Sequence, residues 1–507
     1  MIIKRLFIYC LTVLLVACKA DGLVEDQSVE SQSTPTGVAA PLSNSEFQSL
    51  KPEKQYQVAN KLAATLYKGV PVDEFFDFNT YGDSLKVSDD GNAYLSETRE
   101  ALQIRLKNRD KFVNLIDARH NLGNDDQRVM GEPLASVMEY EISRDQFEVW
   151  MAYILANTIL FSPAEEIASA DSIDVQRIYD GLVRAMGEDV SIRNIILTHM
   201  KSQANWRRFR SPEDNTREMI EIYLGLFDRD ADVPKASIAC KNWSLTGENA
   251  GYELLIDESE RNVEPQKVLG SWVTTCEDFY EVVANHPLVI PRITTYLVDW
   301  FFPTSSAQKR GAIVADIVAK NPVRFHDIFT AIIFSKEYLI NNEKPKSFEE
   351  SFLNLAERIE WRPTDRFIRE LTGNSATEPN LKNMKQPTMS LKLGRFKDQP
   401  MDSLSFAYYH KAVRERVLAK VDNRWGSWGN EFIRKGDFFE QEDFIDFLFL
   451  SIMSRKATQE EIDTLKEVFL DTGNETSREN QTRITFDYIS RLPDLYFYKT
   501  ITTGDAQ

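Results

Sequence analysis

Apolar side chains recur at three- and four-residue spacing along most of this chain, and this periodicity constrains its fold more than any other feature. Because one helical turn takes about 3.6 residues, such spacing places the apolar groups on one face of a helix. Strand-like alternation is scarce, and residues 251–256 form the best candidate strand. We therefore predict an all-α, multi-helix orthogonal bundle with very few short strands. The expected helices span 48–67, 97–120, 144–160, 174–186, 192–208, 212–224, 276–284, 289–302, 307–319, 325–340, 348–359, 403–419, 444–454 and 459–470.

Helix-start signals agree with this pattern. Proline follows Ser162, Ser211 and Asn321, and a proline in the first helical turn costs no hydrogen bond. Thr458 and Glu461 have the spacing of a capping box, in which each side chain caps the backbone N–H of the other residue. Residues 352–364 and 447–458 each read as an apolar helix, a basic turn and a new capped helix, which suggests weakly repeated helical units.

The start of the chain has the layout of a bacterial lipoprotein signal. Lys4 and Arg5 precede a short apolar stretch, which ends in Leu15-Val16-Ala17-Cys18. This stretch is shorter than the roughly 20 apolar residues that span a bilayer, so residues 1–17 are expected to be a cleaved signal peptide. Cys18 then becomes the acylated first residue, whose lipid chains bury in the membrane. The alternative is an ordinary signal peptide with a cysteine at its end by chance.

Lys19 follows the cysteine that we expect to be acylated. In the enterobacterial sorting pattern that this signal resembles, an aspartate at that place favours the inner membrane, so lysine points to the outer membrane. The sequence leaves open whether the protein lies on the periplasmic face or the cell-surface face of that membrane. Residues 18–45 are rich in Ser, Gln, Thr, Pro and Gly, and we expect the lipidated cysteine to be followed by a flexible tether.

Beyond the tether, the chain is long enough for two or three domains. We expect an N-terminal helical domain at 46–345 and a C-terminal helical domain at 346–507. Within the second domain, residues 372–402 hold many polar side chains and show no periodicity. A connection of this length without regular structure is often functional or disordered, and both interpretations stay open.

A net charge of −18 narrows the range of partners. Loss of Lys4 and Arg5 with the signal removes two positive charges and takes the balance to about −20. Nucleic acids and anionic lipid headgroups bind chiefly through attraction of Lys and Arg to phosphate, so a surface this acidic disfavours both. General solubility explains most of the charge, and the membrane contact that we expect is the lipid anchor.

Four cysteines occur, and the signal accounts for two of them. Cys10 leaves with the signal and Cys18 takes lipid, which leaves Cys240 and Cys276 in a compartment that permits disulfides. We expect a disulfide between these two residues, and the alternative is a pair of buried thiols. No Cys-x-x-Cys-His motif occurs, so covalent haem is excluded.

Several segments between about residues 147 and 339 match short motifs. The helix Asn215-Thr216-Arg217-Glu218-Met219-Ile220-Glu221-Ile222-Tyr223-Leu224-Gly225 is close to Asn-x-x-Arg-Glu-x-x-Glu-Leu, and it is one residue shorter than the usual form before its glycine. Lys235-Ala236-Ser237-Ile238-Ala239 looks like a following helix. Lys267-Val268-Leu269-Gly270 and His286-Pro287 match Lys-x-x-Leu-Gly and His-Pro segments.

These segments resemble a family of secreted bacterial helical proteins that often occurs beside sulfatase-like secreted proteins. Trp243 looks like the tryptophan of the family's Leu-Thr-Gly-Trp segment, although Cys240-Lys241-Asn242 precedes it here and Leu245-Thr246-Gly247 follows it. The resemblance covers under half of the chain. It implies a helical fold and carries no established activity or cofactor.

Three charged residues of the Asn215–Gly225 segment are candidates for catalysis. Glu218 and Glu221 are three residues apart and share a helix face, with Arg217 beside them. Two carboxyl groups about 5 Å apart serve retaining glycosidases. The alternative is that these residues join neighbouring helices by ion pairs and hydrogen bonds.

Asp228, Asp230 and Asp232 have the alternating spacing that opens a calcium-binding loop. The pattern then departs from such a loop, because Val233 stands where the sharp turn needs glycine and Ala239 where a bidentate glutamate belongs. An acidic turn between two helices is the alternative.

Other motifs weighed for chemistry are weaker. The five histidines show no metal-ligand spacing, and His286 before Pro287 is expected to cap or end a helix. Neither a Gly-x-Ser-x-Gly elbow nor a glycine-rich phosphate loop occurs. Trp425 and Trp428 flank a flexible Gly-Ser turn and are candidates for stacking on a sugar ring, although packing against helices is commoner.

The sequence therefore favours an all-helical outer-membrane lipoprotein without a cofactor. We expect it to act by binding, as a scaffold or accessory component of a secreted or surface system with a protein partner in the envelope. The alternative is a hydrolase, or the helper of a hydrolase, that acts on envelope or extracellular polysaccharide. A deep cleft with two perturbed carboxylates would favour the enzyme.

Overall fold

The computed structural model describes most of the chain beyond residue 35. Thr36–Gln507 forms one compact unit. Cys18, the expected helix at 97–120 and the tryptophans Trp425 and Trp428 lie outside the described residues. The described residues are 36–72, 76–77, 86–87, 126–142, 146–160, 169, 171–373, 375–381, 383–384, 403–418, 426–427, 432 and 439–501.

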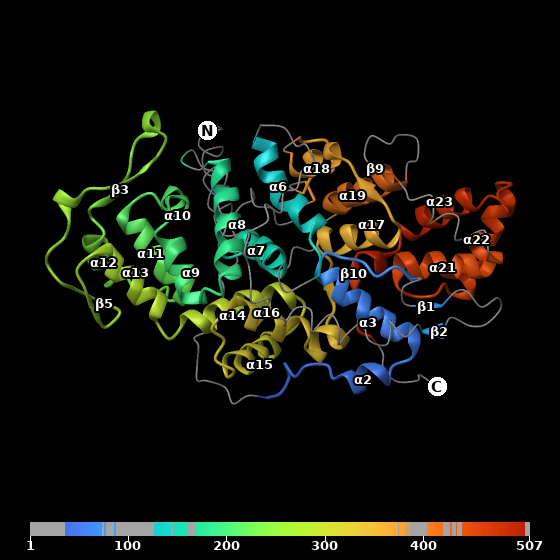
Figure 1. Ribbon diagram of the computed structural model, residues 1–507, viewed down its shortest axis with the longest axis horizontal. Coiled ribbons are helices and arrows are strands. Elements are labelled where there is room, and N and C mark those ends of the chain that lie inside the picture. Colours follow the sequence, from blue (N-terminus) through green and yellow to red (C-terminus); the bar gives the residue numbers. More distant parts are fainter. Residues whose placement is uncertain are drawn as a thin grey trace, which may run out of the picture. The chain divides into compact units, whose positions relative to one another are not determined.

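Helices dominate the described residues, as the periodicity predicts (Figure 1). Among these residues, no helix combines the length and the apolar character that crossing a membrane requires. Three segments, Glu337–Asn341, Glu349–Leu353 and Ala412–Leu418, are wider π-helical turns. The α-helices are α2 (Asn44–Gln48), α3 (Pro52–Thr65), α6 (Asp126–Glu139), α7 (Phe147–Asn157), α8 (Ser172–Gly187), α9 (Ile192–Met200), α10 (Gln203–Arg208), α11 (Pro212–Leu224), α12 (Val233–Ala239), α13 (Cys276–Asn285), α14 (Val289–Phe301), α15 (Ala307–Val318), α16 (Phe325–Ile333), α17 (Asn354–Arg358), α18 (Asp365–Thr372), α19 (Ser403–Lys411), α21 (Gln441–Met453), α22 (Gln459–Asp471) and α23 (Arg478–Ile489).

The described strands are short and pair two by two into antiparallel hairpins or bridges. The candidate strand at 251–256 is confirmed in its second half, where β4 pairs with β3. A second hairpin, β5 with β6, was not expected from the sequence. The strands are β1 (Phe76–Asp77), β2 (Lys86–Val87), β3 (Trp243–Leu245), β4 (Leu254–Ile256), β5 (Gln266–Val268), β6 (Ser271–Val273), β7 (Lys344–Pro345), β8 (Arg362–Pro363), β9 (Gly426–Ser427) and β10 (Phe497–Tyr498).

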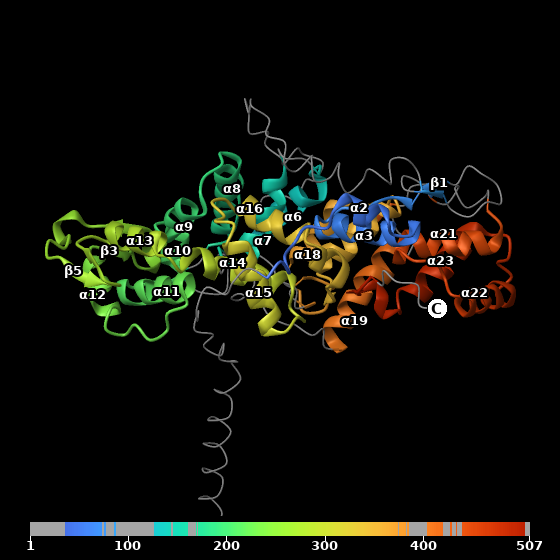
Figure 2. The ribbon, with the colours of Figure 1, turned by 90° about the horizontal axis from the view of Figure 1, so that it is seen from below.

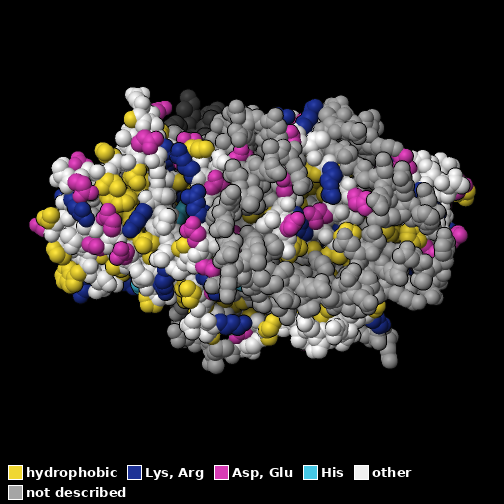
Figure 3. Space-filling model, in the orientation of Figure 1, with side chains coloured by type: hydrophobic (Ala, Val, Ile, Leu, Met, Phe, Trp, Pro, Cys, Tyr) yellow, Lys and Arg dark blue, Asp and Glu magenta, His cyan; other side chains and the backbone are white. Residues whose placement is uncertain are grey.

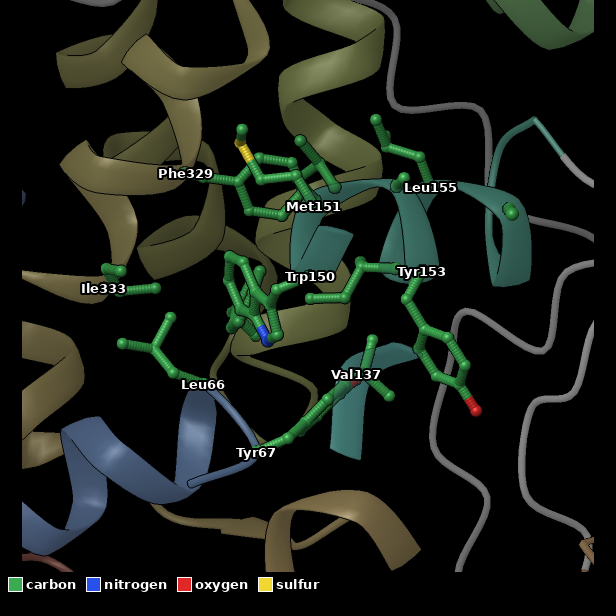
Figure 4. Close-up of a cluster of buried hydrophobic side chains, with 14 of the residues drawn as sticks. Leu66, Tyr67, Val137, Trp150, Met151, Tyr153, Leu155, Phe329 and Ile333 are labelled. Carbon is green, nitrogen blue, oxygen red and sulfur yellow. The ribbon is translucent and has the colours of Figure 1, made fainter. Parts of the chain in front are cut away.

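The core is built around aromatic side chains from helices that are far apart in the sequence. Figure 4 shows Trp150 of α7 surrounded by Leu66, Tyr67 and Phe329. Trp150 is fully buried, and its indole N–H donates a hydrogen bond of 2.7 Å to the backbone carbonyl of Thr65. Because the only polar atom of this large ring has a partner, its burial carries no unpaired donor.

The flexible tether was expected to span residues 18–45, and the part of that span that the structure describes is packed. From Thr36 onwards the chain packs on the helical body, and Ala39 and Leu42 are buried. The carboxylate of Asp316 on α15 accepts hydrogen bonds from the backbone N–H groups of Thr36, Gly37 and Ala39. Burial raises the pKa of Asp316, but together these hydrogen bonds outweigh it and lower the pKa below its usual value. The composition of residues 36–45 concealed this anchoring, because the bonding uses backbone groups that any sequence offers.

A domain boundary was expected between residues 345 and 346, and the described structure is continuous there. Strand β7 (Lys344–Pro345) pairs with β10 (Phe497–Tyr498), which joins the two expected domains at their boundary. Beside this pair, Lys344 and Glu350 form a buried ion pair of 2.7 Å. The weak repeats and the orthogonal arrangement stay predictions.

The part of the expected irregular segment that the structure describes is packed. Leu381 and Met384 are buried, and Glu378 forms an ion pair of 2.7 Å with Arg416. Residues 385–402 lie outside the described residues.

One group of elements positions the site described below. In both views, α9 to α13 lie together with β3 to β6 (Figure 1, Figure 2). Helix α11 packs against α12, α13 and α14, while β5 contacts α12 and β6 contacts α13.

Candidate functional site

A pocket of about 440 Å³ opens where α11, α12, the β5–β6 hairpin and α13 meet. This volume lies in the range of small-molecule sites. Its lining combines an apolar part with a set of basic side chains that come from separate segments. The lining residues are Leu226, Arg229, Asp232, Lys235, Lys267, Leu269, Gly270, His286 and Leu288.

The first wall follows the end of α11. Gly225 ends that helix in the left-handed conformation, with φ of 70°. A Cβ at this position would lie 3.3 Å from the side chain of Arg292, so both the backbone conformation and the available space favour glycine. The chain then turns past Leu226 and Arg229 to Asp232, which precedes α12.

The second wall is the turn of the β5–β6 hairpin. Leu269 and Gly270 have φ of 50° and 80°, the signature of a type I′ turn. Glycine adopts this conformation freely, whereas leucine does so at a cost of about 1–2 kcal/mol. The backbone N–H of Leu269 donates a hydrogen bond of 3.3 Å to Asp232, which ties the turn to the start of α12.

The third wall is the junction between α13 and α14, where His286 caps the end of α13, as the His-Pro motif led us to expect. Its Nδ1 accepts a hydrogen bond of 3.2 Å from the backbone N–H of Leu288. Burial, with the charges of Arg229 and Arg193, lowers the pKa of His286. The imidazole is therefore neutral at pH 7, and because Nδ1 accepts, its proton lies on Nε2, which is a donor.

A disulfide joins α12, which follows the first wall, to α13, which ends at the third wall. Cys240, at the end of α12, and Cys276, the first residue of α13, are bonded and fully buried. The expected pairing is thus present in the structure. On the hairpin, Val268 and Val273 are also fully buried and hold it against the helices. The pocket is therefore built on a cross-linked frame.

The lining of the pocket carries a net positive charge, whereas the whole chain carries a net negative charge. Neither Lys235 nor Lys267 forms an ion pair or hydrogen bond with any described residue, and both side chains are exposed. Arg229 has a loose contact of 3.7 Å with Asp228, whose side chain is 88% exposed. The carboxylate of Asp232 is engaged by the hairpin turn. A protein with a net charge of −18 thus keeps two unpaired lysines and one loosely paired arginine around one recess, which suits an anionic ligand.

The three catalytic candidates lie on α11, outside the lining of this pocket. Burial raises the pKa of Glu218, an effect that Arg208 opposes and Glu221 increases. Arg217 turns to Asp230, with an ion pair of 2.8 Å. For Arg217, this contact fits the alternative in which the side chain joins neighbouring segments.

The three aspartates of the calcium pattern do not converge. The carboxylate of Asp230 pairs with Arg217, that of Asp232 binds the hairpin turn, and Asp228 is exposed beside Arg229. Across the described residues, no three His, Cys, Asp or Glu side chains lie close enough together to hold a metal ion.

Sequence reasoning did not select the basic side chains that line the pocket. Lys235, Lys267 and His286 belong to three of the segments that carry the family resemblance, so a signal existed. Arg229 belongs to none of these segments, and only the fold places it beside the other three.

No protein-family model, curated protein or solved structure matches this chain.

Proposed function

We propose that this protein is an outer-membrane lipoprotein, acylated at Cys18, that binds an anionic ligand in the pocket between α12, α13 and the β5–β6 hairpin. It serves as a non-catalytic binding component of a secreted or surface system. Its membership of the helical secreted family that the motifs resemble is part of this proposal.

The observation that carries the proposal is the pair of lysines without partners. Lys235 and Lys267 stand at one recess, with Arg229 and the Nε2–H of His286 as further donors. In a chain with 78 acidic residues against 60 basic ones, ion-pair partners are abundant, and these lysines have none among the described residues. Cations that keep their charge available in an acidic protein support a role in anion binding.

The lining of the pocket supports binding rather than reaction. Its described residues include one carboxylate, Asp232, which already accepts a hydrogen bond. They include no serine, threonine or cysteine that could act as a nucleophile beside His286. A hydrolase would need a second acid or such a nucleophile.

Calorimetric titration of the full-length protein in neutral detergent tests the binding function. We expect sodium sulfate and sodium phosphate to bind, and the double variant Lys235→Ala/Lys267→Ala to lose about tenfold or more in affinity, since two charge-assisted contacts are removed. The matched control is Lys241→Ala/Lys320→Ala, which removes the same charge from exposed lysines outside the pocket. Equal binding by both double variants would refute an anion site here, and turnover of an envelope polymer would favour the enzyme.

Membrane fractionation tests the anchor separately. Wild-type protein is expected to take up labelled palmitate and to co-purify with the outer membrane. Cys18→Ser should abolish both, while Cys10→Ser, which changes a residue of the cleaved signal, should leave both unchanged. Unaltered labelling of Cys18→Ser would contradict the lipoprotein assignment.

A further inference from the structure

The β5–β6 hairpin carries an exposed tryptophan directly across from a lysine of the pocket. Lys267 on β5 pairs with Trp272 on β6, so their side chains leave the hairpin on the same face. Trp272 is 70% exposed, an unusual state for the largest apolar side chain. The neighbouring residues Val268 and Val273, on the opposite face, are fully buried.

Hydrogen bonds hold in place the backbone that carries this ring. The side-chain amide of Asn262 donates to the backbone carbonyls of Glu264 and Thr274, at 2.7 and 2.8 Å, and so fastens the chain on both sides of the hairpin. Asp278 accepts hydrogen bonds of 2.9 Å from the backbone N–H groups of Thr274 and Thr275, which anchors the hairpin to the start of α13. An indole offered by a fixed backbone loses little conformational entropy when a ligand packs on it.

Acidic side chains are exposed on the segments that lead to Asp232 and to β5. Asp228 and Asp230 are more than four-fifths exposed on one side, and Glu258, Glu260 and Glu264 are exposed along the chain that leads to β5. An extended anionic surface such as a bilayer would meet these carboxylates as well as the lysines, and like charges repel. A slender chain can instead place a single anionic group in the recess.

Figure 3 shows apolar side chains gathered at the end of the molecule where Figure 1 places β3 and β5. Leu255 and Val263 also contribute exposed apolar surface in this segment, at 50% and 81%. Trp272 differs from them because it stands opposite a pocket cation. A flat aromatic ring beside a cation fits a ligand with an apolar C–H face and an acidic substituent, which describes a ring of an acidic sugar.

We propose that the ligand of this pocket is an acidic glycan, with one sugar ring stacked on Trp272 and its carboxylate or sulfate group held by Lys267 and the basic recess. The inference rests on the anion-binding function proposed above, and it names the ligand class of that same site. Trp272 supplies the contact with the ring, and the lysines supply the contact with the charge.

Binding of defined oligomers to the full-length protein in detergent tests this inference. The probes are a galacturonic acid hexamer, a sulfated hexasaccharide, neutral maltohexaose and hexaglutamate. We expect at least one of the two acidic glycans to bind about tenfold more tightly than inorganic sulfate. Maltohexaose and hexaglutamate are expected to bind more weakly than that glycan. The carboxylated and sulfated probes distinguish the two acid groups.

The variant Trp272→Ala separates the ring from the charge. It should lower the affinity for the acidic glycan about tenfold and leave sulfate binding unchanged, while Trp272→Tyr restores part of the loss. Leu255→Ala, which truncates another exposed apolar side chain, is the matched control and should change neither. Because Trp272 is exposed, its loss leaves the core intact.

Three results would overturn the glycan assignment. They are equal glycan affinity in Trp272→Ala and wild type, tighter binding of hexaglutamate than of the acidic glycans, and tight binding to phosphatidylglycerol vesicles. In each case sulfate binding that depends on Lys235 and Lys267 would leave the anion-binding function standing. Loss of that lysine dependence would instead refute the proposed function itself.

Discussion

The carboxylate of Asp232 accepts a hydrogen bond from the backbone N–H of Leu269, and this single contact joins the start of α12 to the turn of a hairpin 37 residues further along the chain. Both residues line the pocket. Leu269 adopts a left-handed conformation that its side chain disfavours, and Asp232 stabilises the turn in which it does so. Asp232 therefore shapes the pocket and also opposes the charge of an anionic ligand.

Replacing Asp232 with asparagine separates these two effects. The amide oxygen can still accept from Leu269, so the melting temperature should stay within about 2 °C of wild type. Removal of the negative charge should raise the affinity for sulfate about threefold to tenfold. Asp230→Asn, which makes the same charge change outside the pocket, should leave sulfate affinity nearly unchanged. Weaker sulfate binding by a stable Asp232→Asn protein would contradict this account of the pocket.

The buried pair of Asp174 and Arg207 should dominate the stability of the region around α8 and α10. The two side chains are almost fully buried and 2.9 Å apart. Asp174→Ala leaves Arg207 buried without its main partner and should cost about 3–5 kcal/mol. Glu253 also contacts Arg207, at 3.4 Å, but its side chain is 61% exposed, so Glu253→Ala should cost less than about 1 kcal/mol. Chemical denaturation measures both values, and equal costs would contradict the prediction.

The disulfide between Cys240 and Cys276 should stabilise the protein by restricting the unfolded chain. It closes a loop with a sequence separation of 36 residues, for which the chain-entropy relation gives about 4 kcal/mol. The double variant Cys240→Ala/Cys276→Ala should lose about that much free energy of unfolding and bind sulfate more weakly, since α12 bears Lys235 and α13 ends at His286. Mass spectrometry of the unreduced protein should find neither thiol alkylated. Two alkylated thiols would refute the bond.

Lys61 on α3 should make stability depend on pH in the alkaline range. Burial lowers the pKa of Lys61 from 10.5 to about 7, helped by the charge of Lys344 and opposed by Glu350. Between pH 7 and pH 10 the unfolded chain therefore binds a proton at this lysine that the folded protein does not. The free energy of unfolding should rise with pH in this window, by up to about 1.4 kcal/mol per pH unit. Below pH 7 both the folded and the unfolded protein bind the proton, so Lys61 adds no pH dependence to the free energy of unfolding there.

The variant Lys61→Met tests that assignment. It should reduce the rise between pH 7 and pH 10, because one group that titrates differently in the two states is gone, while Lys346, whose pKa burial also lowers to about 7, still contributes. Lys54→Met, on the same helix but partly exposed, should keep the slope of wild type. Denaturant titrations at constant ionic strength give the slopes, and identical slopes for Lys61→Met and wild type would contradict the prediction.

Helix positions followed from local sequence wherever the stabilising contacts are local. The expected helix at 212–224 has the bounds of α11, because Ser211 caps its start and Gly225 ends it. The capping box of Thr458 and Glu461 is present at the start of α22. Such contacts join residues within one turn, so their spacing in the sequence is enough to predict them.

Local patterns missed interruptions that keep the apolar spacing intact. One helix was expected at 192–208, but Ser202 accepts a hydrogen bond from the backbone N–H of Asn205 and begins a new helix, α10. The expected helix at 403–419 instead changes from α19 to a π-helical turn at Ala412. Each interruption shifts the apolar face of the helix by a residue or two. The apolar side chains still recur at three- or four-residue spacing, so the sequence pattern does not reveal the break.

The helical class of this protein was therefore determined by its sequence alone, because amphipathic spacing and helix caps act over a few residues. The basic pocket was decided by the tertiary structure. Arg229, Lys235, Lys267 and His286 come from four segments, and they meet only where a disulfide, a strained turn held by Asp232 and a capped helix end bring those segments together. Contacts between distant segments depend on packing of the whole unit, and no short pattern in the sequence encodes them.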